Sequence, residues 1–303
     1  MQVLISQLSI ILIIIAIGYV GARRGYFSKE FTKTASSLTM NVLLTAMVLE
    51  SVFSELPEFG GAEFARLMLI CTACMVITYI VGFLCALPLR RKSARASVFE
   101  LLIAAPNSMF IGAPLVRELY GSGAVFYLIL TCIPFNVLLY TYGVWRMNQG
   151  GGTKIGLRDM LTMPLIASIA AMFIAIFRIK APEFICDLCS IISGATVPMS
   201  MIVIGASLGS VKLGKALTEP LTYAAALVRL VVCPIVVWLI LRIFVSDPIL
   251  LNTMIINAAV PSAIVIAVLA IQYDRDAEFA SEGILVSMLM SIITVPLISK
   301  LLF

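Results

Sequence analysis

The sequence contains no histidine and few charged residues, since only 12% of its 303 residues are Asp, Glu, Lys or Arg. Soluble domains carry about 25% charged residues. Apolar residues make up 61% of this chain, and its mean hydropathy is +1.10. This composition excludes an ordinary soluble domain and predicts a polytopic membrane protein.

Sequence motifs of common catalytic centres are also missing. The chain contains no HExxH, GxSxG or Walker sequence, which argues against an intramembrane protease and against an ATP-driven pump. Without histidine, and without a buried pair of aspartates, a proton relay of the pump type has few groups to use. The formal charge of +5 lies in short loops rather than along one face. We therefore expect no enzyme activity, no metal, no cofactor and no nucleic-acid partner.

Seven cysteines lie mostly in apolar segments, and Cys71/Cys74 and Cys186/Cys189 have CxxC spacing. Such pairs can hold zinc or act in redox chemistry, but here they lack histidine and any strand context. A free cysteine behaves as a small buried hydrophobic residue. We expect these cysteines to pack between helices.

A helix needs about 20 apolar residues to cross a bilayer. By this measure we predict ten spans: 4–22, 33–54, 64–88, 95–119, 122–146, 158–179, 184–208, 219–245, 249–273 and 279–302. Arg23 and Arg24 follow the first span, which is the wrong order for a cleaved signal peptide. Most of the 21 basic residues fall in the loops after the odd-numbered spans. Those loops are predicted to be cytoplasmic, with both termini outside.

The longest polar connection, residues 147–157, contains three consecutive glycines and is predicted to be a flexible cytoplasmic linker. It divides the chain into residues 1–146 and 158–303, with five predicted spans in each half. An odd number of spans gives the two halves opposite orientations in the membrane, so any repeat must be inverted. The predicted fold class is an all-α membrane protein with ten transmembrane helices in two inverted five-helix repeats.

Spans four and nine are interrupted by residues that break helices or add polar groups. These residues are Pro106, Asn107, Ser108, Gly112 and Pro114 in span four, and Asn257, Pro261 and Ser262 in span nine. In lipid, backbone released from helical hydrogen bonds must find partners inside the protein or in a watery cavity. An ordinary proline kink is one explanation for each span. Two interrupted spans at comparable positions in two halves point instead to the binding site of a transporter.

If both spans unwind, each is divided into two half-helices. The N-terminus of the half-helix after the break then points into the protein. Each such end presents free N–H groups and about half a positive charge. Two of them favour an anion such as a carboxylate. Because the halves are inverted, the two broken spans would run antiparallel and cross.

Other polar residues are candidates for the same cavity. Asn41 and Thr45 lie one helical turn apart in span two, although an Asn there could simply bond a neighbouring helix. Pro198 suggests a local break in span seven, where Gly205 and Gly209 could equally serve close helix packing.

Ionisable residues inside the spans are few, and three of them bear on the site. Arg229 lies deep in span eight, so it should face the interior of the bundle or a neighbouring carbonyl. Glu50 and Glu100 lie near span ends and are expected at the interface with the lipid headgroups.

Several segments resemble the auxin efflux carrier family, which includes plant auxin exporters and bacterial permeases assigned to small organic acids. NSMFIGAPLVRELYG resembles the family's fourth-span signature, and NAAVPSAIVIAVLAIQYDRDAEFAS its ninth span and following loop. IAIGYVGARRGYFSKE, PMSMIVIGASLG and LVRLVVCPIVVW resemble its first, seventh and eighth spans. Thr45 stands where the family usually has a proline, which leaves open whether span two is broken. Arg229 stands where relatives often carry Lys.

The resemblance implies a fold like that of sodium/proton antiporters and bile-acid symporters, with spans four and nine crossed. It also implies a scaffold of spans one, two, six and seven that mediates homodimerisation. A transport domain of spans three to five and eight to ten would slide against this scaffold like an elevator. Asn107 is then the first candidate for substrate contact, joined by the backbone of residues 112–114 and 257–262 and by span seven near Pro198.

We expect a secondary carrier for a small organic anion in the bacterial inner membrane. Two alternatives stay open. One is a sodium- or proton-coupled symporter, in which unwound carbonyls near Pro114 and Pro261 would hold Na⁺. The other is a membrane sensor that binds a ligand at the same crossing without transporting it. Half-helix dipoles favour an anion but do not distinguish one carboxylate from another.

Overall fold

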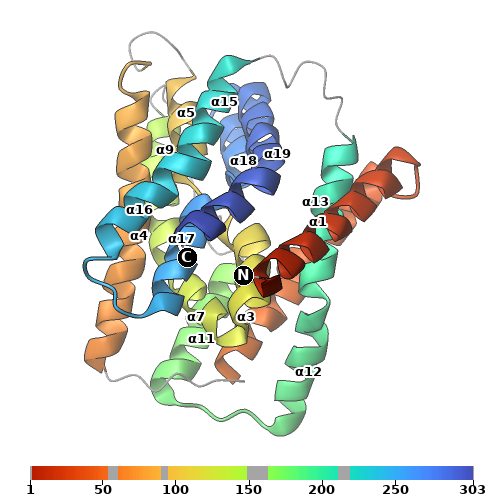
Figure 1. The fold of residues 1–303 in the computed structure, drawn as a ribbon, viewed down its shortest axis with the longest axis vertical. Helices are drawn as coiled ribbons and strands as arrows, with labels where there is room; N and C mark the ends of the chain where they lie inside the picture. Colours follow the sequence, from red (N-terminus) through yellow and green to blue (C-terminus); the bar gives the residue numbers. More distant parts are fainter. Residues whose placement is uncertain (1, 54–60, 90–94, 149–162, 211–218, 303) are drawn as a thin grey trace. The chain divides into compact units, whose positions relative to one another are not determined.

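The computed structural model describes residues 2–53, 61–89, 95–148, 163–210 and 219–302. In these ranges every regular secondary-structure element is a helix, and no strand is formed (Figure 1). The predicted linker 147–157 lies outside the described residues except for Met147 and Asn148, as do several of the loop cations on which the predicted orientation depends.

Six helical stretches of the described chain are long and apolar enough to cross a membrane: Glu30–Phe53, Gly61–Ala86, Ser122–Met147, Glu183–Ala206, Pro220–Leu241 and Ala277–Leu302. Shorter apolar helices are Ile13–Arg23, Leu165–Phe177 and Pro248–Ala259. These stretches coincide with predicted spans, but the total of ten spans and the inverted repeat stay predictions.

The chain forms two compact units, each assembled from separate parts of the sequence. The first unit is Met1–Ala65, Met109–Leu130 and Thr162–Lys212, and the second unit is Arg66–Ser108, Thr131–Leu161 and Leu213–Phe303. Both predicted halves of the sequence therefore contribute to both units.

The first unit contains α1 (Gln2–Arg23), α2 (Lys29–Leu38), the π-helical turn η1 (Thr39–Leu43), α3 (Leu44–Phe53), α6 (Ala113–Tyr120), α7 (Ser122–Leu130), α11 (Met163–Phe177), α12 (Glu183–Gly194) and α13 (Thr196–Ser210). The helix α3 packs against α7, α11 and α12. The helices α2, η1 and α3 follow one another without a non-helical residue. Span two is therefore wound throughout, with a π turn in place of a break.

The helices α1 and α13 lie side by side and make the most extensive helix–helix contact of the first unit (Figure 1). Small residues allow this approach. A Cβ atom added to Gly209 would lie 2.7 Å from the carbonyl oxygen of Tyr19, and one added to Gly205 would collide with the carbonyl of Ile15. The packing role suggested for Gly205 and Gly209 is thus confirmed.

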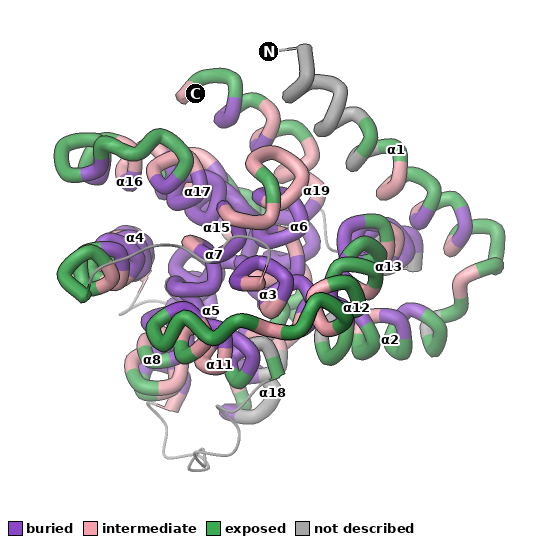
Figure 2. The backbone as a smooth tube through the Cα atoms, turned by 90° about the horizontal axis from the view of Figure 1, so that it is seen from below, coloured by how far each residue is buried: buried purple, intermediate pink, exposed green. Residues whose placement is uncertain are grey.

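The second unit contains most of α4 (Gly61–Ala86), α5 (Ala96–Ala104), α8 (Cys132–Leu138), η3 (Leu139–Gly143), α9 (Val144–Met147), α15 (Pro220–Leu227), η4 (Val228–Val232), α16 (Cys233–Leu241), α17 (Pro248–Ala259), α18 (Val265–Gln272) and α19 (Ala277–Leu302). Every residue of α5 is buried, whereas most of α12 in the first unit is not (Figure 2). Five of the seven cysteines are buried among these helices and those of the first unit, as expected of packing residues.

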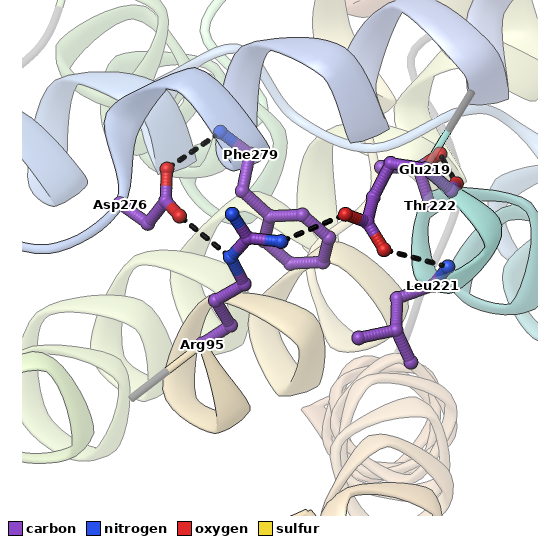
Figure 3. A network of polar contacts seen from close by, with 6 residues as sticks. All are labelled: Arg95, Glu219, Leu221, Thr222, Asp276 and Phe279. Atoms are coloured by element: carbon purple, nitrogen blue, oxygen red, sulfur yellow. Dashed lines mark hydrogen bonds and ion pairs between the residues drawn. The ribbon is translucent and has the colours of Figure 1, made fainter. Parts of the chain in front are cut away.

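An arginine joins three helix N-termini of the second unit (Figure 3). The Arg95 guanidinium, just before α5, bonds Asp276 at 2.6 Å and Glu219 at 2.8 Å, and lies over the ring of Phe279. Asp276 also accepts from the Phe279 amide at the start of α19, and Glu219 caps α15. Asp276, one of the acidic residues after span nine, thus pairs with Arg95, the first residue of predicted span four.

Glu50 and Glu100 are not interfacial as predicted, because both are buried in ion pairs. In the first unit, Glu50 accepts from Arg117 at 2.9 Å and from the Ser193 hydroxyl at 2.6 Å. In the second unit, Glu100 is fully buried and binds Arg146 at 2.8 Å. Breaking a buried pair leaves an uncompensated charge, which typically costs about 3–5 kcal/mol.

We predict that Gly205→Ala destabilises the protein, because the added methyl collides with backbone and overpacking costs about 1–3 kcal/mol. Gly194→Ala is the matched control, since a Cβ there meets open space. A Gly-to-Ala change inside a helix otherwise stabilises by about 0.5–1 kcal/mol. Thermal unfolding in detergent should show a lower melting temperature for Gly205→Ala only, and equal melting temperatures would contradict the packing role.

Candidate substrate-binding site

The two predicted interruptions are present in the second unit, and each has a proline as its cause. The helix α5 ends at Ala104, and α17 ends at Ala259. Pro106 and Pro261 disfavour helical geometry in the residue before them. Ala105 accordingly has ψ 108° and Val260 has ψ 153°, both extended. Helical geometry resumes at Ser108 in the first segment and at Val265 in the second.

The two unwound segments pair with each other. The Asn107 amide donates to the Pro261 carbonyl at 2.9 Å, and the Ala263 amide donates to the Ala105 carbonyl at 3.0 Å. The pairing is antiparallel and centres on Pro106 and Ser262. Backbone groups released from the helices therefore satisfy one another away from water, as a membrane interior requires.

Each proline also leaves a carbonyl one turn earlier without its helical partner, because proline has no N–H. Pro106 cannot donate to the Leu102 carbonyl. The Ser262 hydroxyl donates to this carbonyl instead, at 2.6 Å. The Thr78 hydroxyl of α4 bonds the Ala104 carbonyl at 3.0 Å. The amide of Ser262 in turn donates to the Ser287 hydroxyl of α19 at 3.2 Å.

Arg229 binds the remaining carbonyls at the C-terminal ends of both interrupted helices. It lies in η4 and is fully buried. Its Nη1 donates to the Ile103 carbonyl at 3.0 Å, its Nη2 to the Asn257 carbonyl at 2.9 Å, and its Nε to the Val260 carbonyl at 3.0 Å. The prediction that Arg229 faces neighbouring carbonyls is confirmed. In the described part of the chain, none of the ion pairs involves Arg229.

The N-terminal ends of the second half-helices begin near the same pairing. Ser108 follows the paired Pro106 by two residues, and Val265 follows the paired Ser262 by three. At no more than about 3.6 Å per residue, each helix start lies within roughly 11 Å of the pairing. Both positive helix ends are therefore close to one point of the second unit.

Several buried polar atoms in residues 107–108 and in the last two turns of α17 have no hydrogen-bond partner. They are Nδ2 of Asn107, Oγ of Ser108, Oγ1 of Thr253 and both amide atoms of Asn257. Asn107 is 8% exposed and Asn257 is fully buried. The Cys74 thiol contacts both the Asn257 side chain and the Met254 carbonyl, but a thiol is a weak hydrogen-bonding partner and does not satisfy an amide. Unsatisfied buried groups cost about 1–3 kcal/mol each, so this cluster is suited to a ligand.

The structure brings together five of the ten predicted site residues: Asn107, Ser108, Asn257, Pro261 and Ser262. Gly112 and Pro114 do not lie in the unwound segment as predicted, because the helix has already resumed at Ser108. Pro106, four residues after Leu102, makes the break earlier.

The three predicted residues of spans two and seven lie in the first unit. Asn41 is exposed and donates to Ser37 of its own helix at 3.1 Å, so it does not line a buried cavity in this unit. Thr45 is half-buried and its hydroxyl has no partner. Pro198 is exposed, and the helix interruption is at Ala195, three residues earlier. Their place in the binding site stays a prediction, because they belong to the first unit and the crossing belongs to the second.

Sequence reasoning missed the hydroxyl groups that support the crossing, namely those of Thr78 and Ser287. Single hydroxyl residues are common in apolar helices, where they often bond the preceding turn, so their positions gave no separate signal. Among the described residues, no group of three or more Cys, Asp or Glu is placed to hold a metal ion.

We predict that Ser262→Ala destabilises the protein by about 1–3 kcal/mol, because the buried Leu102 carbonyl loses its partner. Ser281→Ala is the matched control, since its exposed hydroxyl bonds only the Ala277 carbonyl of its own helix. Thermal unfolding of the two variants should separate them. Equal melting temperatures would mean that the hydroxyl of Ser262 does not support the crossing.

Comparison with known proteins gives one family and several relatives of similar length. The model of a family described as membrane transport protein matches residues 3–156 and 152–299. An uncharacterized transporter of Methanothermobacter thermautotrophicus is 26% identical over 300 residues, which cover 96% of each chain. The uncharacterized transporter YfdV of Escherichia coli K12 is 22% identical over 305 residues, covering 97% of this chain and 96% of the relative.

Proposed function

Because the chain belongs to the membrane transport protein family, we propose that it is a secondary carrier of a small organic anion. Family and relatives make it a multi-pass membrane transporter and not an enzyme. The anionic substrate, the site and the mode of movement are our proposal. The antiparallel pairing of two unwound segments, with two helix N-termini beside it, is the observation that carries it.

The charge distribution at the crossing favours an anion. Each half-helix N-terminus is equivalent to about half a positive charge, so the two together approach one unit. Asn107 Nδ2 and Asn257 Nδ2 are donors without partners in the described structure. A hydrogen bond to a charged group contributes about 1.5–3 kcal/mol. Such bonds would favour a carboxylate over a neutral molecule of the same shape.

The same features favour a singly charged carboxylate over a phosphate. Multiply charged phosphates are usually bound by Arg or Lys side chains that point at them. Of the described cations, the one at this crossing is Arg229, and its guanidinium is directed at four backbone carbonyls. Partial charges and amide donors match one negative charge better than two.

We further propose that the second unit moves relative to the first during transport, in an elevator-like cycle. The second unit holds most helices of predicted spans three, eight, nine and ten, and the first holds those of spans one, two, six and seven. Both unwound segments, from Ala105 to Asn107 and from Val260 to Ile264, belong to the second unit. The substrate would thus travel with one body. The first unit would be the scaffold, and the homodimer contact would form there.

Asn107→Ala should lower uptake of labelled carboxylates into proteoliposomes about tenfold or more, since one hydrogen bond to a charged group is lost. Asn136→Ala is the matched control: it is also 8% exposed, but its Nδ2 bonds the Cys132 carbonyl of its own helix. Both variants should elute as monodisperse protein. Undiminished uptake by Asn107→Ala at equal protein level would overturn the site.

A thermal-shift screen of the purified protein against carboxylates would identify the substrate, because a ligand that prefers the folded state raises the melting temperature. We expect carboxylates to stabilise the protein and Asn107→Ala to lose this effect. A carboxylate that binds at the crossing without being transported into proteoliposomes would identify a sensor instead of a carrier.

A further inference from the structure

We propose that the guanidinium of Arg229 is a built-in substitute for a coupling cation, so that this carrier works without Na⁺. The proposal deepens the proposed function, since it concerns the ion dependence of the same crossing. It would answer the question, open at the level of sequence, of whether carbonyls near Pro261 hold Na⁺.

The position of Arg229 is the first argument. In transporters with discontinuous helices, coupling Na⁺ is held by unwound carbonyls and by the C-terminal ends of half-helices. Here the corresponding oxygens are those of Ile103 and Ala104 at the end of α5, and of Asn257 and Val260 at the end of α17. All four accept from Arg229, at 2.9–3.5 Å.

The charge of Arg229 is the second argument. The C-terminal ends of two helices together present about one negative charge, and an arginine remains protonated in proteins. No carboxylate among the described residues forms an ion pair with it. Its compensation therefore comes from helix dipoles and carbonyls, which is the environment that a bound Na⁺ would otherwise have.

The two kinds of helix end then take opposite charges. Arg229 occupies the negative ends of α5 and α17, while the positive end at Ser108 has the unpartnered Asn107 amide and Ser108 hydroxyl beside it. A fixed cation at one side of the crossing also attracts the anion at the other. A carrier that holds this charge covalently does not need to bind and release a metal ion with each substrate molecule.

The experiment measures ²²Na⁺ binding and thermal stability of the full-length protein in detergent, in sodium chloride and in choline chloride of equal ionic strength. Wild-type protein should bind no ²²Na⁺ and should melt at the same temperature in both salts. Saturable ²²Na⁺ binding by the wild type, or stabilisation by sodium over choline, would overturn the proposal. This arm requires no variant.

Arg229→Ala should empty the carbonyl cluster and create a site for a small cation. We expect its melting temperature to rise by about 5 °C or more in saturating sodium chloride relative to choline chloride. Low concentrations of guanidinium chloride, which replaces the lost group, should stabilise Arg229→Ala and not the wild type. A folded Arg229→Ala protein that melts identically in sodium, choline and guanidinium salts would contradict the proposal.

Arg242→Ala is the matched control. Arg242 is exposed at the end of α16, where it lies over the ring of Trp238. Its removal opens no carbonyl cluster, so it should not confer sodium dependence, and sodium dependence there would also contradict the proposal. These measurements use no organic substrate. Undiminished uptake by Asn107→Ala would thus overturn the anion site without affecting the result for Arg229. Sodium binding by the wild type would overturn the role of Arg229 without affecting the anion site.

Discussion

The hydrogen bonding of the backbone at the crossing is the constraint on which the second unit depends. Two prolines, four residues after Leu102 and Asn257, remove the amides that would have closed α5 and α17. A buried carbonyl without a partner is costly, and in a membrane no water is available to bond it. The structure provides a partner for each deprived carbonyl: a hydroxyl for Leu102 and a guanidinium for Asn257. The neighbouring helices are held in place by the same contacts.

This arrangement treats the two ends of the helices differently. The C-terminal carbonyls of α5 and α17 are bonded by groups of the protein itself. The polar side chains nearest the helix starts, Asn107 and Ser108, keep unpartnered atoms although they are buried. Helix dipoles make the first location negative and the second positive. The proposed anion site rests on this difference, because the unpartnered polar atoms lie beside the positive helix start.

Local rules account for what could be predicted from the sequence. A proline has no N–H, so both breaks could be located to within a few residues. A buried arginine needs hydrogen-bond acceptors, so the sequence could predict that Arg229 bonds backbone carbonyls, although not which residues provide them. Glycines spaced along one face allow close packing, which α1 and α13 show. Glu50 and Glu100 were misplaced because position along a span gives depth in the membrane. It does not reveal a partner 67 or 46 residues away, such as Arg117 and Arg146.

The sequence by itself determined that the protein is helical and membrane-embedded, and it determined where two of its helices break. Composition and the chemistry of proline are sufficient for both, since neither depends on distant residues. Only the tertiary structure decided that the two breaks pair with each other, that Arg229 closes both helix ends, and that Gly112 and Pro114 lie inside a resumed helix. It also showed that Asn41 and Pro198 are exposed in the first unit. Side chains acquire partners through packing between segments far apart in the chain, and no local pattern specifies that packing.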